Sequence, residues 1–187
     1  MIFLGIDLAA LEKRPSGYCI LEKINNELLC KTGIIKKDSE IIKLAHENKP
    51  IVISIDSPLS FSRNGKAFRL CDIEARRRGF MVLPLNISSM KLLTLRGIRI
   101  KKELCGMGFE VIEVFPTGAF KSLNIPLPKR DFNKTIENLR KLNLKFDKVK
   151  TIHELDAIIS AYTAYKYYKK EAIILGDQEE GTIVFPL

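Results

Sequence analysis

The sequence lacks any hydrophobic run long enough to cross a membrane. No apolar stretch approaches the roughly 18 to 20 residues that a spanning helix needs. The N-terminal segment MIFLGIDLAALEKR has no basic residue ahead of its short apolar stretch and already contains an aspartate, Asp7, which is unlike a secretory signal. These absences predict a soluble protein that stays in the cytoplasm and has no membrane partner.

The sequence also lacks closely spaced cysteines. Its four cysteines form no C-x-x-C motif, which argues against a zinc knuckle and against a thioredoxin-type redox site. We expect them to be small buried apolar residues of a protein kept in a reducing compartment. They are Cys19, Cys30, Cys71 and Cys105.

The remaining composition is that of one ordinary globular domain. The 187 residues are 46% hydrophobic and 28% charged, and no repeat or linker divides them, so we expect a single domain over residues 1–187. The formal net charge of +9 suits a partner that carries phosphates, because Lys and Arg release counterions from a nucleic-acid backbone. The bias towards Lys and Ile is equally typical of a hot or AT-rich source. No feature sets the oligomeric state.

Strands and helices alternate along most of the chain. Three almost continuously apolar segments predict strands buried on both faces of a sheet: residues 1–9, 51–58 and 109–116. Two β-like runs joined at Asn25 and Asn26 predict a hairpin, and the tail 171–187 contains two short β-like pieces about a Gly-Asp turn. Helices are expected over residues 39–48, 70–79, 88–108, 130–144 and 151–170, although Gly97 weakens the third. This order predicts an α/β fold with a mixed sheet.

Carboxylates mark the ends of the buried strands. Asp7 and Asp56 lie near the carboxyl ends of the first two, and Glu113 is the only charge in the middle of the third. Ligands of open α/β folds usually bind at this edge of the sheet, so we expect the three side chains to converge there. A carboxylate in an apolar strand needs a partner, and Mg²⁺ takes oxygen ligands of this kind. Two such ions, Mg²⁺ or Mn²⁺, would activate a water and stabilise the leaving oxygen of a phosphodiester.

The last predicted helix supplies two further candidates. Thr151 followed by Glu154 fits the S/T-x-x-E capping box, which places His153 and Asp156 in the first turns and on one face. The helix N-terminus favours an ionised Asp156, and His153 is suited to position a water, shuttle a proton or ligate the metal. Alanines on nearby helix positions leave room for a close approach to the sheet; they are Ala157, Ala161 and Ala164.

Six segments, in order over nearly the whole chain, are similar to the DUF429 family of predicted nucleases with a ribonuclease H-like fold. The segments are GIDLA with PSGYCILE, SIDSPL, RLCDIEARRRG, VIEVFP, HELDAIISAYTAY and EGTIVFP. The resemblance implies a five-stranded mixed sheet, its first three strands antiparallel, flanked by helices. It also implies that Asp7, Asp56 and Asp156 occupy the carboxylate positions of the broader fold, and Glu113 fits the family pattern.

The H-x-x-D-A portion of the last helix is also similar to the end of the active site in RuvC-type resolvases. There a histidine or aspartate precedes the final aspartate by three positions, as His153 precedes Asp156, and an alanine follows. For the second carboxylate of the resolvase pattern, Asp56 is a better match than Glu113. The carboxylates at separate strand and helix ends, the basic charge and this resemblance together predict a Mg²⁺- or Mn²⁺-dependent nuclease that acts on DNA or RNA.

Each candidate also has a purely structural interpretation. Asp7 could pair with a cation, Asp56 could form a turn before Ser-Pro, and a buried Glu113 could pair with an arginine. His153 could be an ordinary surface residue at a helix start.

Two other functions stay open at the level of the sequence. One is a phosphotransferase of the actin-like ATPase and sugar-kinase group, although LAALEKRPSG after Asp7 lacks the Gly and Ser or Thr pattern that cradles phosphate there. The other is a nucleic-acid-binding relative of the same fold without catalytic activity.

Overall fold

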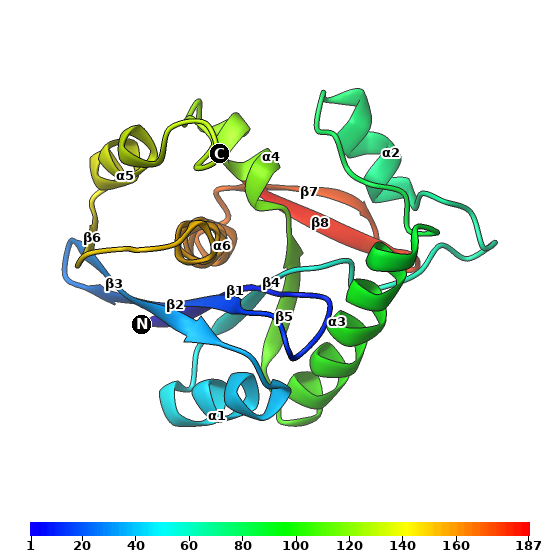
Figure 1. Cartoon of the computed structure of the whole chain (residues 1–187), viewed down its shortest axis with the longest axis horizontal. Coiled ribbons are helices and arrows are strands. Elements are labelled where there is room, and N and C mark those ends of the chain that lie inside the picture. Colours follow the sequence, from blue (N-terminus) through cyan, green and yellow to red (C-terminus); the bar gives the residue numbers. More distant parts are fainter.

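The computed structural model describes residues 1–187 and is built around one mixed β-sheet (Figure 1). Its strands are β1 (Ile2–Asp7), β2 (Ser16–Ile24), β3 (Glu27–Ile35), β4 (Val52–Asp56), β5 (Glu110–Val114), β6 (Leu144–Phe146), β7 (Ala172–Asp177) and β8 (Gly181–Pro186). Their order across the sheet is β6-β3-β2-β1-β4-β5-β8-β7. The α/β class and the mixed sheet predicted from the sequence are confirmed.

The number of strands differs from the expectation. The first three strands are antiparallel, as the family resemblance implies, but the sheet has eight strands and the implied five is wrong. The five central strands form a continuous block, β3-β2-β1-β4-β5, and the extra strands lie at its edges. β6 pairs in parallel with β3 on one side, while β8 joins β5 and carries β7 on the other.

Helices cover both faces of the sheet (Figure 1). They are α1 (Asp38–Asn48), α2 (Leu70–Arg77), α3 (Ser88–Gly106), α4 (Pro116–Ser122), α5 (Phe132–Lys141) and α6 (Ile152–Tyr168). The largest apolar core includes Phe3, Val52 and Val114 on the α6 face, and a second includes Ile6, Ile53 and Ile55 on the face of α1 and α3. No helix is both long and apolar enough to span a membrane.

Most local predictions hold, and the exceptions have local causes. Asn25 has the positive φ that a two-residue hairpin turn requires between β2 and β3. Pro116, expected only to end a strand, also begins α4, because proline fits the first position of a helix. The predicted Gly-Asp turn is wrong, since both residues end β7 and the turn follows them. The expectation that all four cysteines are buried holds for Cys19 and Cys71, whereas Cys30 is partly exposed and Cys105 is exposed.

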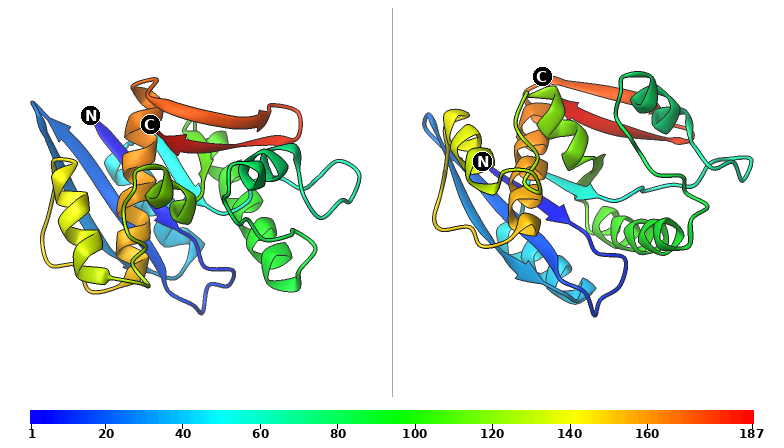
Figure 2. Two further views of the ribbon diagram at one scale, coloured as in Figure 1. Left: turned by 90° about the horizontal axis from the view of Figure 1, so that it is seen from above. Right: turned by 45° about the horizontal axis from the view of Figure 1, so that its top comes forward.

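α6 lies unusually close to the sheet, and glycine permits this. A Cβ added at Gly5 of β1 would lie 2.3 Å from the carbonyl oxygen of Ala157, and one added at Gly17 of β2 would lie 2.0 Å from that of His153. The predicted close approach through alanines is therefore confirmed at Ala157 and Ala161, which face Gly5. Figure 1 shows α6 end-on above the strands, and Figure 2 shows it along its length.

Gly17→Ala should destabilise the protein by about 1–3 kcal/mol, because the new methyl group meets backbone atoms that cannot move without shifting α6. Urea unfolding measures the change. Gly106→Ala at the end of α3 is the matched control, since nothing lies within 4 Å of its added Cβ and alanine favours a helix by up to about 1 kcal/mol. Equal stabilities for the two variants would contradict the close contact.

Candidate active site

Asp7 and Asp56 are neighbours across two parallel strands. They are register partners at the carboxyl ends of β1 and β4, so their side chains leave the sheet on the same face. That face is the one covered by α6, because Ser54, two residues before Asp56, donates a 2.8 Å hydrogen bond from Oγ to the Ser160 carbonyl. The sheet therefore presents both carboxylates to the start of the last helix.

The start of α6 is held by its own capping box and by β3. The Thr151 hydroxyl accepts a hydrogen bond from the Glu154 N–H at 3.2 Å, and the Glu154 carboxylate accepts one from the Thr151 N–H at 2.9 Å, as the sequence predicts. Glu154 also accepts a 3.0 Å hydrogen bond from the hydroxyl of Thr32 in β3. These contacts determine where the first turn of α6, with His153 and Asp156, meets the sheet.

His153 contacts Asp7 directly. Its Nδ1 lies 2.6 Å from Oδ2 of Asp7, across 146 positions of sequence, and this hydrogen bond raises the pKa of the imidazole. The His153 side chain is 46% exposed, whereas that of Asp7 is 13% exposed, so the imidazole forms the solvent side of the pair. Its Nε2 is the ring nitrogen available to a bound molecule.

The three aspartates are close enough to repel one another. Burial, with the charges of Asp7 and Asp156, raises the pKa of Asp56 well above its ordinary value. Burial and the charge of Asp7 raise the pKa of Asp156 to about 7, against the opposing effects of His153 and Lys129. Lys129 is an exposed residue of the loop before α5, and nothing in the sequence singles it out. The site thus concentrates negative charge that the protein itself neutralises only in part.

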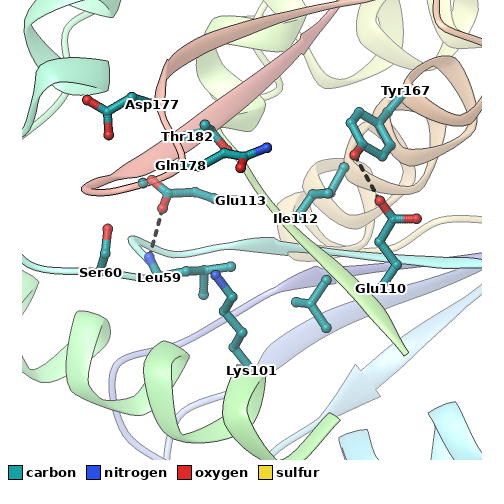
Figure 3. Close-up of a pocket in the computed structure, with 12 residues that line it drawn as sticks. Leu59, Ser60, Lys101, Glu110, Ile112, Glu113, Tyr167, Asp177, Gln178 and Thr182 are labelled. Carbon is teal, nitrogen blue, oxygen red and sulfur yellow. Dashed lines mark hydrogen bonds between the residues drawn. The ribbon is translucent and has the colours of Figure 1, made fainter. Parts of the chain in front are cut away.

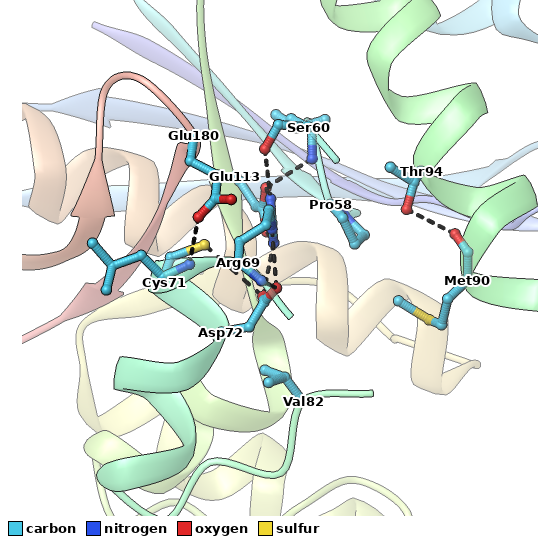
Figure 4. A network of polar contacts seen from close by, with 12 residues as sticks. Pro58, Ser60, Arg69, Cys71, Asp72, Val82, Met90, Thr94, Glu113 and Glu180 are labelled. Carbon is cyan, nitrogen blue, oxygen red and sulfur yellow. Dashed lines mark hydrogen bonds and ion pairs between the residues drawn. The ribbon is translucent and has the colours of Figure 1, made fainter. Parts of the chain in front are cut away.

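Glu113 does not join Asp7 and Asp156, although it lies near enough to Asp56 for its charge to help raise the pKa of that carboxyl group. Val114 is the register partner of Asp56, so the side chain of Glu113, one residue earlier, points to the opposite face of the sheet. Both of its oxygens accept hydrogen bonds from Arg69, at 2.6 and 2.7 Å, and Oε2 also accepts one from the N–H of Leu59 (Figures 3 and 4). This is the arginine pairing that the sequence left open.

Arg69 connects three segments around Asp56. Its side chain is 1% exposed, and its five N–H donors are all used, on Asp72, Glu113 and Ser60. Ser60 and Leu59 belong to the loop that directly follows Asp56, so the buried ion pairs hold that loop against α2 and β5. Figure 4 shows this network.

Arg96 holds the loop that follows Asp7, as Arg69 holds the loop after Asp56. It is buried in α3 and donates to the carbonyl oxygens of Ala9 and Lys36 at 2.6 and 2.7 Å, and to Asp38 at 2.8 Å. Arg69 and Arg96 are both buried and bonded within the protein, so neither is free to contact a phosphate.

A pocket of about 230 Å³ lies where β5 and β8 diverge, since these strands pair only at Val114 and Val184 (Figure 3). Its walls include Glu113, Lys101 and Glu110, and Glu110 accepts a 2.8 Å hydrogen bond from the hydroxyl of Tyr167. This pocket opens at the split in the sheet and includes none of the three aspartates.

The donor chemistry of the aspartate site fits a divalent cation. No three His, Cys, Asp or Glu side chains are arranged closely enough to close around one ion. However, carboxylate oxygens are the ligands that Mg²⁺ and Mn²⁺ take, and a cation between them would relieve the repulsion that raises the pKa of Asp56 and of Asp156. The residues that would hold such an ion are Asp7, Asp56 and Asp156.

Solved structures of other proteins share this fold. The chain superposes on RuvC of T. thermophilus in complex with a Holliday junction substrate with a TM-score of 0.53 and 14% identity, over 91% of this chain and 96% of that one. It superposes on another Thermus thermophilus RuvC structure with a TM-score of 0.55 and 12% identity, over 91% and 97% of the two chains. At these identities the likeness defines the class of fold, which is the ribonuclease H-like fold of RuvC.

Within that class, the chain belongs to the DUF429 family, described as proteins of unknown function, whose model matches residues 5–180. No curated protein of assigned function matches the sequence. The family resemblance that the sequence motifs indicate is confirmed.

Asp56→Asn should raise the stability of the metal-free protein by roughly 1 kcal/mol, or about 2–4 °C in Tm, because it removes a desolvated charge that two neighbouring aspartates repel. Thermal unfolding in the presence of a chelator measures the change. Asp147→Asn at an exposed position should leave Tm unchanged. A lower Tm for Asp56→Asn would contradict the repulsion.

Arg69→Met should destabilise the protein by about 3–5 kcal/mol, because it leaves Glu113 and Asp72 buried without their partner. Arg63→Met is the control, since Arg63 pairs with Glu179 where both side chains are more than half exposed, and such pairs contribute about 1 kcal/mol or less. Urea unfolding of both variants provides the comparison. Similar losses would show that burial of the Arg69 network has little effect on stability.

Proposed function

We propose that this protein is a metal-dependent nuclease that hydrolyses phosphodiester bonds in DNA or RNA. The observation that carries the proposal is the meeting of Asp7, Asp56 and Asp156 on one face of the sheet, with His153 bonded to Asp7. Such a cluster at the carboxyl edge of an α/β sheet is suited to hold divalent ions against a phosphate.

The proposed cofactors are Mg²⁺ or Mn²⁺, with two ions in the complete site. Bound ions of this kind supply an activated water and stabilise the leaving oxygen of the phosphodiester. Asp7 lies between the other groups, and we propose that it would bridge the two ions. Asp56 and Asp156 would supply the remaining carboxylate ligands. The raised pKa of each of the latter two favours protonation in the free protein, so binding of an ion would release protons from the site.

His153 and Lys129 have different proposed roles. The Asp7 carboxylate holds His153 through Nδ1, which leaves Nε2 to take or give a proton at the substrate. The charge of Lys129 acts on both His153 and Asp156, and we propose that its ammonium group contacts a phosphate oxygen of the substrate. We propose that Glu113 acts indirectly, by holding Arg69 and the loop after Asp56.

Two observations support nucleic acid as the substrate. The chain carries a formal net charge of +9, which favours a polyanion. The fold is also that of RuvC, which has been solved with a Holliday junction substrate. On this likeness we include four-way junctions, with duplex and single-stranded DNA and RNA, among the substrates to be tested.

The purified protein should cleave at least one of these nucleic acids with Mg²⁺ or Mn²⁺ and none with a chelator. Asp7→Asn should lower the rate by roughly 100-fold or more, the scale expected when one main electrostatic stabiliser of a transition state is lost. Gel electrophoresis of labelled substrates measures the rate, and titration calorimetry with Mn²⁺ measures ion binding separately.

Asp147→Asn, at an exposed position outside the proposed ligand set, should cleave like the parent protein. Cleavage that survives Asp7→Asn would contradict the assignment of the site. Mn²⁺ binding with nucleic-acid binding but no cleavage of any substrate would instead favour a relative of the fold without catalytic activity.

A further inference from the structure

A second pocket, of about 200 Å³, opens directly beside Asp56. Its walls come from the loop after β4, the segment between α2 and α3, the first turns of α3 and the end of β5. Apolar side chains form about half of this wall: Val82, Leu83, Met90, Leu93, Val114, Phe115 and Ile183. Figure 4 shows Val82 and Met90 beside the Arg69 network, which forms the polar part of the lining. This pocket is distinct from the one at the split between β5 and β8.

The size of the pocket limits what it can hold. Sites for drug-sized ligands measure about 300–1,000 Å³, so this pocket admits a single small ring system. Its lining is suited to a flat apolar group, because methyl, thioether and aromatic side chains contact such a face without needing hydrogen bonds. Asp56 lies at the pocket and also in the aspartate cluster, so a group bound here is adjacent to whatever occupies that cluster.

The charges of the lining exclude a phosphate. Arg69 is the only cationic residue in the wall, and all its donors are used on Asp72, Glu113 and Ser60. The other ionisable groups of the wall are carboxylates. The wall thus holds three carboxyl groups against one arginine with no free donor, an arrangement that disfavours an anionic ligand and admits a neutral ring.

The hydrogen-bonding groups of the lining select among neutral rings. The hydroxyl of Ser57 already donates within the protein, at 3.0 Å to Pro58 and 3.1 Å to Leu93, so it is not free to donate to a ligand. The wall does offer an acceptor, since Oε1 of Glu113 accepts a single hydrogen bond. A ring that carries an amino group matches this pattern, and carboxylates recognise the amino group of cytosine in the same way.

We propose that this pocket takes one unstacked, amino-bearing nucleobase of the substrate, from the nucleotide next to the bond that the aspartate cluster would cut. The inference rests on the proposed nuclease function and adds a base preference to it. Adenine, cytosine and guanine carry the amino group, and thymine and uracil lack it. Extracting a base from its stack costs a few kcal/mol, and a fitted apolar pocket is the usual way to offset that cost.

The test compares two short oligonucleotides in the presence of a chelator, so that no cleavage occurs. One is an oligothymidylate, and the other is the same chain with 2-aminopurine, a fluorescent amino-bearing base, at its centre. The full-length protein should bind the second roughly tenfold more tightly, as one good base contact discriminates on this scale, and fluorescence of the 2-aminopurine should rise as it leaves the stack.

Met90→Trp, which fills the pocket from α3, should reduce the affinity for the 2-aminopurine chain to that for plain oligothymidylate. Leu95→Trp is the matched control, since Leu95 is 50% exposed on the same helix and lies outside the pocket. Leu83→Trp, from another part of the wall and 57% exposed, is the second filling variant if Met90→Trp does not fold.

The possible outcomes test the base pocket and the nuclease function separately. Equal affinity of the parent protein for the two oligonucleotides, or a preference that survives both filling variants, overturns the base pocket alone. Failure to bind either oligonucleotide overturns the base pocket, and cleavage of a junction, duplex or single strand in Mg²⁺ or Mn²⁺ then decides the proposed function separately. Selective binding of 2-aminopurine without cleavage of any nucleic acid in Mg²⁺ or Mn²⁺ overturns the nuclease and leaves the base pocket standing.

Discussion

The contact between the backbone of α6 and the sheet is the constraint on which the site depends. A helix usually rests on a sheet through a layer of side chains, which keeps the two backbones apart. Here Gly5 and Gly17 remove that layer, and the first turn of α6 reaches the ends of β1 and β2. His153 can therefore form a hydrogen bond with Asp7, and Asp156 lies close enough to Asp7 for the charge of Asp7 to raise the pKa of Asp156. The same closeness leaves Asp56 and Asp156 only partly exposed, and this partial burial, with the neighbouring negative charges, raises the pKa of both carboxyl groups.

Two buried arginines hold the loops that follow Asp7 and Asp56. Each strand that ends in an aspartate is followed by a loop, and each loop is held by a guanidinium: Arg96 after Asp7 and Arg69 after Asp56. Their charges are satisfied by carboxylates and carbonyl oxygens of the protein itself. Part of the positive charge of the chain is thus used to fix the backbone around the aspartates, and only the exposed lysines and arginines remain for a polyanionic partner.

Local patterns account for what the sequence predicts correctly. The capping box of Thr151 and Glu154 and the turn at Asn25 depend on residues a few positions apart, so they can be recognised without the fold. Asp7, Asp56 and Asp156 converge as expected, because the carboxyl ends of parallel strands meet at one edge and the last helix starts there.

The errors come from pairings that no local pattern records. Glu113 is a strand residue like Asp56, but strand register puts its side chain on the other face, and its partner Arg69 lies 44 positions away. β6 has three residues and exists through its pairing with β3, so its own sequence carries little signal. Gly97 weakened the prediction of α3 on propensity alone. In the fold it lets α3 pass within contact of Ser57, so a residue unfavourable to the helix favours the packing.

The order of the elements also governs when the protein can acquire its site during synthesis. Asp7 and Asp56 leave the ribosome early, but their partners on α6 are separated from Asp7 by almost 150 residues of chain. A nascent chain that ends before Thr151 contains neither His153 nor Asp156, whatever else it has folded. Truncated products of translation therefore carry an incomplete cluster, and the assembled site is a property of chains in which α6 has docked.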